Sequence, residues 1–586
     1  MTLSVLRTSM ADLPAKLVDG ETRMTLEASL DHVPQPLRFG TSGRRGLLVD
    51  LTPLEVYINA FAELEYLKQL PPEAGGIKAG DRFLVAADLR PSSTRLDGNG
   101  CGELAQTILC AVADAGLLPV YLGTIPTPAL TLYALDQGKG SIMVTGSHIP
   151  FDRNGYKTNT ALGELMKHHE APIGQQVERV RRQRYEEASR VSPFGPDGRF
   201  KKTLPPLPPP DDSATEVYID RYVDFFGENA LEGLHVLVYQ HCAVGRDILA
   251  KILRSLGARV TEAGRSETFV PIDTENVEDA LMEVMQRLID EVSLTEGPID
   301  VLLSTDGDSD RPLVLAIDLA TQRAQFIGGD VLGMLTARWL QPDAVVVPIS
   351  CNDAIDRGDL QSRLEPKTAI GSPFVIQGMM RAVEQGKRFV CGFEANGGFL
   401  TATPFFRGGA WLKALPTRDA VLPMVAVLTA AREAQKTLLD LVAELPARYS
   451  RAALLRNFDR AKSQRILKRL TPPLEGLETV IFDRDQVLLG HGQPPCDPQP
   501  FWVIRDRLGD FFTASDGFSS IHGINATDGL RIQFTNGDVA HLRASGNADE
   551  FRIYAVADHP ERANAIVALG IAEPQGILRH LEREYL

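Results

Sequence analysis

Asp306, Asp308 and Asp310 occupy every second position of the stretch LLSTDGDSDRPLVLAID, between two apolar runs that predict strands. Three carboxylates this close repel one another unless a cation lies among them. An EF-hand loop has the same spacing but requires glycine at its sixth position and glutamate at its twelfth, where this chain has Arg311 and Ile317. The stretch therefore favours a loop for a small hard ion such as Mg2+, with open positions for phosphate oxygens that Arg311 would also contact. The alternative is an acidic surface turn.

Ser147 follows a short apolar run in the stretch SIMVTGSHIPFDRNGYK. Because SIMV predicts a buried strand, the serine lies in the loop that leaves it, where α/β folds place ligand-handling groups. A serine hydroxyl is a weak nucleophile that needs a base or a charge beside it. His148 and Lys157 are the local candidates, since DRNGY predicts a turn that returns the lysine toward the serine. The residues alone leave open a nucleophile and a turn serine, and without a G-x-S-x-G elbow they do not indicate an esterase.

A short polar loop near the C-terminus favours an anion site. In the stretch LRASGNADEFRIY, an arginine, a hydroxyl and exposed backbone amides come together at Arg543, Ser545, Gly546 and Asn547. Arginine and backbone N–H groups are the donors that bind phosphate in proteins. The alternative is an ordinary hairpin that carries one arginine.

Two further glycine-rich loops carry polar groups. Glu394 and Asn396 lie among glycines in CGFEANGGF, after the strand-like run RFVCG, and a carboxylate with an amide is suited to sugar hydroxyls. The stretch RFGTSGRRG contains basic residues that include Arg45. It matches neither the G-x-G-x-x-G pattern nor the Walker P-loop, since no GK[ST] follows.

The elements that must position these loops alternate between strand and helix patterns. RFLVAADLR, GELAQTILCAVADAG and LLPVYLG predict strand, helix and strand, and LHVLVYQ, GRDILAKILRSLG and ARVTEAG repeat that order. A looser third copy begins at AVVVPIS. Repeated strand–helix–strand units predict α/β domains with mostly parallel sheets, and the repetition indicates duplicated domains.

Composition shifts predict where the domains end. The proline-rich stretch KTLPPLPPPDD is a stiff linker, a second break lies near residues 324–329, and a third lies after Leu445. The segment RYSRAALLRNFDRAKSQRILKRL predicts a basic amphipathic helix, most simply a solvated face. The last part has the short strands and turns of an α+β domain. We expect an N-terminal extension and four domains, over residues 1–34, 35–212, 213–327, 328–448 and 449–586.

The chain has 586 residues, too many for a single core, and a formal net charge of -15. This acidity argues against a general nucleic-acid binder, although a pocket can be locally basic. Six scattered cysteines without a CxxC pair indicate reduced thiols and a cytoplasmic location. We see neither a signal peptide nor an apolar run of about 18 residues, so we expect no membrane partner.

Taken together and in this order, GTSGRRG, TGSHIPFDRNGYK, DGDSDR, the glutamate loop and the arginine loop resemble the α-D-phosphohexomutase family, which includes the phosphoglucomutases and phosphomannomutases. The resemblance extends from about Pro36 over nearly the whole chain. It implies four domains around a central cleft, three of them related α/β domains and the last α+β. It also implies an enzyme that interconverts the 1-phosphate and 6-phosphate of mannose and/or glucose.

The resemblance implies a role for each loop. Ser147 corresponds to the serine that is phosphorylated in the resting enzyme, and its phosphate would complete the shell of one Mg2+ ion held by Asp306, Asp308 and Asp310. Lys157 corresponds to a general acid/base near the reacting hydroxyl.

The remaining positions surround the substrate. His148, Arg45 and Arg311 correspond to residues close to the phosphoserine, and Glu394, with Asn396 in its loop, to the glutamate that grips a sugar hydroxyl. The loop that holds the non-reacting phosphate corresponds to Arg543, Ser545, Gly546 and Asn547. The implied partners are small sugar phosphates, with hexose 1,6-bisphosphate as intermediate and activator, and no oligomeric state is predicted.

This chain departs from the family pattern at several positions. The family has asparagine where Ile149 stands, and its sugar loop reads GExSGH, whereas here Phe393 intervenes, Asn396 replaces the serine and Gly398 replaces the histidine. These differences leave alternatives open: a hexose 1,6-bisphosphate synthase on the same fold, a catalytically silent sugar-phosphate sensor, and a metal-dependent phosphatase.

Overall fold

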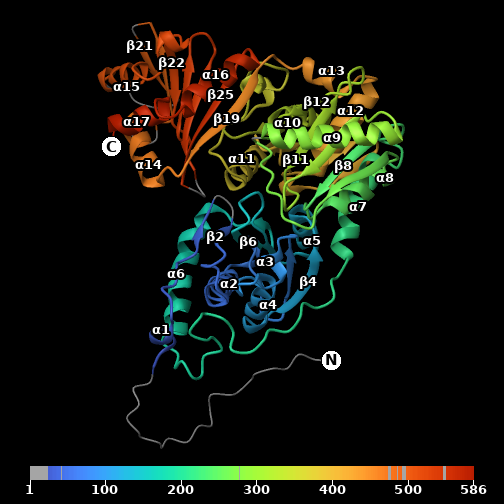
Figure 1. The fold of residues 1–586 in the computed structure, drawn as a ribbon, viewed down its shortest axis with the longest axis vertical. Helices are drawn as coiled ribbons and strands as arrows, with labels where there is room; N and C mark the ends of the chain where they lie inside the picture. The colour runs from blue at the N-terminus through green and yellow to red at the C-terminus, as the bar shows by residue number, and fades with distance from the viewer. Residues whose placement is uncertain are drawn as a thin grey trace, which may run out of the picture.

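The computed structural model describes residues 24–40, 43–275, 277–472, 477–484, 486–490, 497–545 and 549–585. These residues form four domains, each built on its own sheet, and one separate two-stranded hairpin. In Figure 1 the first domain, in blue, lies below, and the second, third and C-terminal domains form a row above it, from green to red. The expected architecture of three α/β domains and a C-terminal α+β domain is confirmed, while the exact boundaries stay a prediction.

The sheet of the first domain has the strand order β1-β2-β6-β5-β3-β4, with β7 paired to β6. Alternate residues of β3 enter two different cores, Phe83 and Val85 on one face and Leu84 and Ala86 on the other, because helices cover both faces. The strands are β1 (Arg38–Phe39), β2 (Arg44–Leu47), β3 (Arg82–Ala87), β4 (Leu118–Thr124), β5 (Ser141–Val144), β6 (Arg153–Thr160) and β7 (Gly163–Glu164). The helices are α1 (Leu26–Ser29), α2 (Pro53–Leu67), α3 (Pro91–Thr94), α4 (Leu104–Asp114), α5 (Thr127–Gln137) and α6 (Lys167–Tyr185).

The second domain has the order β12-β11-β10-β8-β9, and the third has the order β13-β14-β15-β18. The second contains α7 (Ser213–Phe226), β8 (His235–His241), α8 (Arg246–Ser255), β9 (Arg259–Arg265), α9 (Asp279–Glu296), β10 (Val301–Thr305), β11 (Pro312–Ile317) and β12 (Ala324–Ile327). The third contains α10 (Gly329–Leu340), β13 (Ala344–Val346), α11 (Ser372–Glu384), β14 (Val390–Phe393), β15 (Phe399–Thr401), β18 (Leu415–Asp419), α12 (Val421–Ala434) and α13 (Leu438–Ala443). The separate hairpin pairs β16 (Phe405–Arg407) with β17 (Ala410–Leu412).

The C-terminal domain is an antiparallel sheet in the order β19-β25-β24-β23-β22-β20-β21, and its helices include α14, α16 and α17, which pack against one another or against the sheet. Its strands are β19 (Tyr449–Arg456), β20 (Thr479–Asp483), β21 (Gln486–Leu489), β22 (Ile521–Asn525), β23 (Leu530–Phe534), β24 (Val539–Ala544) and β25 (Glu550–Ala557). Its helices are α14 (Arg460–Leu470), α15 (Gln499–Gly509), α16 (Pro560–Ile571) and α17 (Ile577–Tyr585). This domain has a hydrophobic core of its own.

One feature recurs in the first three domains and positions the candidate residues. In each, a strand that is parallel to one neighbour continues through a loop into an antiparallel strand: β5 into β6, β10 into β11, and β14 into β15. Ser147, the three aspartates and Glu394 lie in these three equivalent loops. The three loops therefore occupy the same place in each domain, and side-chain contacts join the loops of the three domains to one another.

Three expectations about the elements need correction. The sheets are mixed and not mostly parallel, because the candidate loops connect antiparallel strands. DRNGY is not a turn: most of it begins β6, which pairs with β5 so that Lys157 lies opposite Met143. The segment expected as one basic helix contains β19 before α14, since β19 pairs along its whole length with β25.

Part of the expected N-terminal extension packs on the first domain. Leu26 in α1 is fully buried in the core that contains α2, and its backbone N–H donates to the carbonyl of Glu187. Within the described ranges, no helix has the length and apolar character needed to cross a membrane.

Candidate active site

Ser147 lies in a tight loop and points at the acidic loop of the second domain. Its Oγ donates to Oδ2 of Asp306 at 2.7 Å and lies 3.3 Å from Nδ1 of His148. The serine is buried, and its φ of +52° is in the left-handed region, which is costly for a residue with a side chain. A hydroxyl held in a strained backbone against a carboxylate is typical of a functional position rather than of a turn serine.

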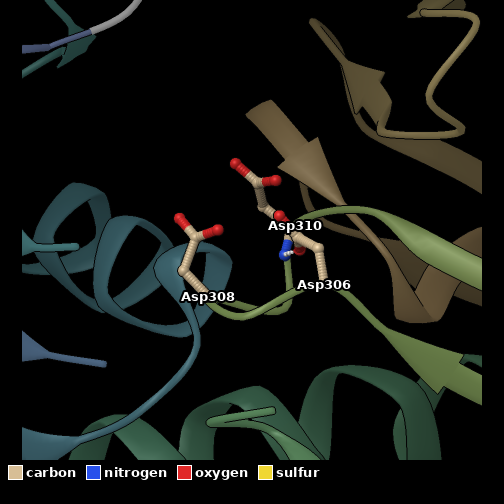
Figure 2. Close-up of side chains that lie close together, drawn as sticks. All are labelled: Asp306, Asp308 and Asp310. Carbon is tan, nitrogen blue, oxygen red and sulfur yellow. Dashed lines mark hydrogen bonds between the residues drawn. The ribbon is translucent and has the colours of Figure 1, made fainter. Parts of the chain in front are cut away.

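The three aspartates are buried and converge. Their nearest carboxylate oxygens all lie within 4.8 Å of one another, and Figure 2 shows the side chains extending from the single loop between β10 and β11. Oδ1 of Asp306 accepts the backbone N–H groups of Asp310 and Arg311 at 3.2 Å each, which fixes the turn. Oδ2 of Asp308 accepts the hydroxyl of Thr127 at 2.7 Å, so the first domain also positions the loop.

Lys157 supplies a positive charge among these carboxylates. Its Nζ donates to Oδ2 of Asp308 at 2.7 Å and to Oδ2 of Asp310 at 2.8 Å. Burial lowers the pKa of the lysine, but the two aspartates outweigh burial and raise it. For Asp306, burial and the two neighbouring carboxylates raise the pKa well above its usual value. At Asp308 and Asp310, by contrast, nearby cations outweigh burial and lower the pKa, so Asp306 is the carboxylate of the loop whose charge is offset least.

The arrangement fits a bound cation. Oδ1 of Asp308 and Oδ1 of Asp310 are buried and accept no hydrogen bond from the residues that the structure describes. A buried carboxylate oxygen without a hydrogen bond is costly, and a hard divalent ion prefers such oxygens as ligands. The residues present thus form a group that is suited to a metal ion.

Cationic side chains surround the acidic loop. Arg311 is buried, with Nε at 3.7 Å from Oδ1 of Asp310. Burial, reinforced by Arg311, lowers the pKa of Arg45 to about 10, so this arginine stays charged at neutral pH. Burial together with Arg311 and Arg45 lowers the pKa of His148 well below its usual value, so the imidazole is neutral. The rim of the loop is therefore suited to an anion.

The glutamate loop reaches the aspartates through an arginine that the sequence analysis missed. Glu394 and Asn396 are both buried, and Asn396 Oδ1 accepts the backbone N–H of Gly398 at 2.9 Å. Arg418, in β18, donates from Nη1 to Oε2 of Glu394 at 3.0 Å and from Nε to Oδ2 of Asp310 at 3.1 Å. A signal was present, because the apolar run ALPTRDAVL contains adjacent charges that need buried partners.

Arg90 was also missed, and it holds the serine loop. Its guanidinium donates to the carbonyls of Ser147 at 3.0 Å, Pro150 at 2.9 Å and Arg153 at 2.9 Å, and also to that of Ile149. The ring of Phe269, from the second domain, stacks at 3.8 Å from its charged carbon. The signal was an arginine at the end of the strand-like run RFLVAADLR, three residues after the last residue of β3.

Arg543 of the anion loop is linked to the third domain through Asp528. Arg543, at the end of β24, donates from Nε to Oδ1 of Asp528 at 3.1 Å, and Oδ2 of Asp528 accepts the N–H of Ile370 in the third domain at 3.0 Å. Ser545 is buried, and its N–H donates to the carbonyl of Glu550. The other two predicted residues of this loop, Gly546 and Asn547, lie outside the described residues, as do Thr41 and Ser42 beside Arg45.

Family models match three parts of the chain. They are described as phosphoglucomutase/phosphomannomutase alpha/beta/alpha domains I, II and III, and they match residues 36–184, 216–318 and 328–449. Each match contains one of the three equivalent loops.

Curated relatives match over most of their length. A phosphomannomutase of Sinorhizobium fredii is 35% identical over 539 residues, which cover 91% of this chain and 98% of that protein. A phosphomannomutase of Salmonella muenchen is 33% identical over 532 residues, with 91% and 94% covered. Among solved structures, a putative phosphomannomutase of Thermus thermophilus has a TM-score of 0.59 at 20% identity, and it covers 91% of this chain and 98% of its own.

Proposed function

The chain belongs to the phosphoglucomutase/phosphomannomutase family and is a phosphohexomutase, and we propose that it interconverts the 1- and 6-phosphates of mannose and/or glucose through a phosphoserine at Ser147. The observation that carries this proposal is the contact of 2.7 Å between Ser147 Oγ and Asp306 Oδ2, across 159 residues. It joins the only candidate nucleophile of our sequence analysis to the acidic loop. The relatives named phosphomannomutase favour mannose as a substrate.

Two phosphoryl transfers account for the isomerisation. In the first, the bond between phosphorus and Ser147 Oγ breaks as a bond forms to the free hydroxyl of the hexose phosphate, giving a hexose 1,6-bisphosphate. The proton of that hydroxyl ends on Ser147 Oγ. We propose that Lys157, which lies among the aspartates, transfers this proton as the general acid/base. After the bisphosphate turns over, the serine takes the other phosphoryl group and the proton returns, which leaves the isomer.

We assign one Mg2+ to Asp306, Asp308 and Asp310, with an oxygen on Ser147 as a further ligand. When bound, the ion would offset charge that spreads over the phosphoryl oxygens. Arg45 and Arg311 add positive charge at the rim of the acidic loop. The neutral imidazole of His148 can form a hydrogen bond with Ser147 Oγ.

Substrate recognition is assigned to the two outer loops. Glu394 and Asn396 would contact sugar hydroxyls, and Arg543 with Ser545, Gly546 and Asn547 would hold the phosphate that does not react. Either end of the bisphosphate carries a phosphate, so one such site serves both halves of the reaction. Solved relatives with similar folds include a mutase in complex with glucose 1,6-bisphosphate, with a TM-score of 0.51.

The test is a coupled assay with Mg2+ and a trace of hexose 1,6-bisphosphate, on mannose 1-phosphate and glucose 1-phosphate in parallel. We expect wild-type turnover of at least one sugar and its loss in Ser147→Ala, while Ser515→Ala, which removes an exposed serine hydroxyl, is unchanged. Bisphosphate that accumulates without isomer would assign a synthase instead, and release of inorganic phosphate at the same rate would assign a phosphatase. No turnover of either sugar would contradict the proposal and favour a sensor.

A further inference from the structure

Arg418 lies where the second and third domains meet. It is 3% exposed, and the register of β15 with β18, in which Phe399 lies opposite Asp419, places it beside the glutamate loop. It donates hydrogen bonds to carboxylates of two different domains, to Asp310 at 3.1 Å and to Glu394 at 3.0 Å. One guanidinium thus connects the metal loop to the sugar loop.

Gly398 makes room for this side chain. A Cβ at position 398 would lie 2.5 Å from both Cγ and Cδ of Arg418, closer than carbon atoms approach one another. The backbone of Gly398 is also fixed, because its carbonyl accepts the N–H of Glu394 and its N–H donates to Asn396. A larger residue at this position would therefore displace Arg418 together with the part of β18 that carries it, because the Cβ of Arg418 also lies only 2.8 Å from the added atom.

The guanidinium and a divalent cation would share one carboxylate. Oδ2 of Asp310 accepts from both Arg418 and Lys157, while its Oδ1 accepts no hydrogen bond within the described part of the chain. Like charges a few ångströms apart in a buried site repel strongly. A cation bound at Asp310 would therefore weaken the ion pair between Asp310 and Arg418. The guanidinium would then interact mainly with Glu394.

We propose that Arg418 is a positioning residue that makes metal affinity and sugar affinity depend on one another, by dividing its charge between Asp310 and Glu394. This rests on the proposed function of the two loops. With its charge present, Arg418 opposes metal binding and holds buried Glu394 in place, by the hydrogen bond of 3.0 Å, as an acceptor for sugar hydroxyls. Without it, the metal binds more tightly and the sugar more weakly.

The first experiment is calorimetric titration of the chelator-treated protein with MgCl2 alone. We expect Arg418→Met to bind Mg2+ at least about threefold more tightly than wild type, because a repelling charge is gone. Arg418→Lys keeps the charge and should stay within about twofold of wild type. Lys413→Met removes an exposed charge nearby and serves as the matched control, with no change expected. Unchanged or weaker Mg2+ binding by Arg418→Met overturns the proposal, since a purely structural ion pair predicts that result.

The second experiment measures kinetics with the substrate that the coupled assay identifies. We expect Arg418→Met to raise KM at least about tenfold and to lower kcat less, because ground-state contacts are lost. Gly398→Ala, which keeps the arginine but displaces it, should raise KM too. An unchanged KM in Arg418→Met would overturn the proposal. If the wild type shows no isomerisation, the proposed function fails, and the MgCl2 titration still decides the role of Arg418.

Discussion

At the scale of single residues, buried charges in this protein are held by partners from other domains. Ser147 and Lys157 of the first domain contact aspartates of the second, and Arg418 of the third contacts Asp310. Buried charges are tolerated when they are paired and hydrogen-bonded. Assembly of the domains and assembly of the site are therefore the same event.

Arg90 gives a prediction at this scale. Because its guanidinium donates to the carbonyls of Ser147 and Pro150, we expect Arg90→Met to release the strained serine loop. A misplaced nucleophile lowers the transfer rate more than substrate binding, so kcat should fall about 100-fold with a smaller change in KM. Steady-state kinetics and crystallography of the variant check this.

Arg95 offers the control for that variant. Arg90 directly precedes the short helix α3 and Arg95 directly follows it, but the side chain of Arg95 is exposed. Arg95→Met should therefore keep the wild-type kcat. A wild-type kcat in Arg90→Met would show that the four carbonyl contacts do not position the serine.

At the scale of elements, β24 carries a buried histidine behind the anion loop. His541 donates from Nε2 to the carbonyl of Asp528 at 2.6 Å, and Asp528 in turn holds Arg543. Burial, together with the charge of Arg531, lowers the pKa of His541 to about 4. The neutral imidazole is thus part of the packing that supports the predicted phosphate site.

The lowered pKa predicts a loss of stability in acid. The unfolded chain takes up a proton on this histidine near its ordinary pKa of about 6.5, whereas the folded chain does so only near pH 4. The free energy of unfolding is therefore not reduced by this histidine above pH 6.5. It falls as the pH drops from 6.5 toward 4, by about 3 kcal/mol at most. Urea unfolding at pH 7 and pH 5 should show less pH dependence in His541→Gln than in wild type. His522→Gln, on the exposed side of β22, should match wild type, and an equal pH dependence in all three proteins would contradict the prediction.

At the scale of the whole molecule, one arginine joins the third and C-terminal domains. Arg448, which directly precedes β19, donates to both carboxylate oxygens of Asp353, to Asp558 and to the carbonyl of Gly537. Its side chain is buried, and β19, the strand that follows it, leads into the C-terminal sheet (Figure 1). This contact fixes the C-terminal sheet relative to the third domain.

Arg448→Met should loosen the C-terminal domain. The variant removes the shortest ion pairs of Asp353 and leaves the longer ones, to Arg357 at 3.5 Å and Arg531 at 4.0 Å, so the cost should be at most about 3–5 kcal/mol. We expect faster proteolysis near residues 446–449, a larger radius of gyration in solution scattering and a raised KM, with Mg2+ affinity unchanged because the aspartates lie in the second domain. Arg451→Met, which removes an exposed arginine in the same strand, is the control. An unchanged radius and cleavage rate would show that other contacts fix this domain.

The sequence by itself determined the local parts of the protein. Apolar runs predicted β3, β5, β8 and β10, and the spacing of Asp306, Asp308 and Asp310 predicted a loop for a cation, because strand burial and carboxylate repulsion act over a few residues. The resemblance to the family supplied the roles of distant residues such as Arg543, and these roles stay predictions.

Only the tertiary structure decided what depends on residues far apart in the chain. β19 carries a basic, helix-like pattern, yet it is a strand because β25, about 100 residues later, pairs with it. The position of the Arg418 side chain depends on its hydrogen bond to Asp310, 108 residues away, and on the space that Gly398 leaves because it has no side chain. Such partners are chosen by the packing of domains, and no local pattern of residue types records which buried charge will meet which.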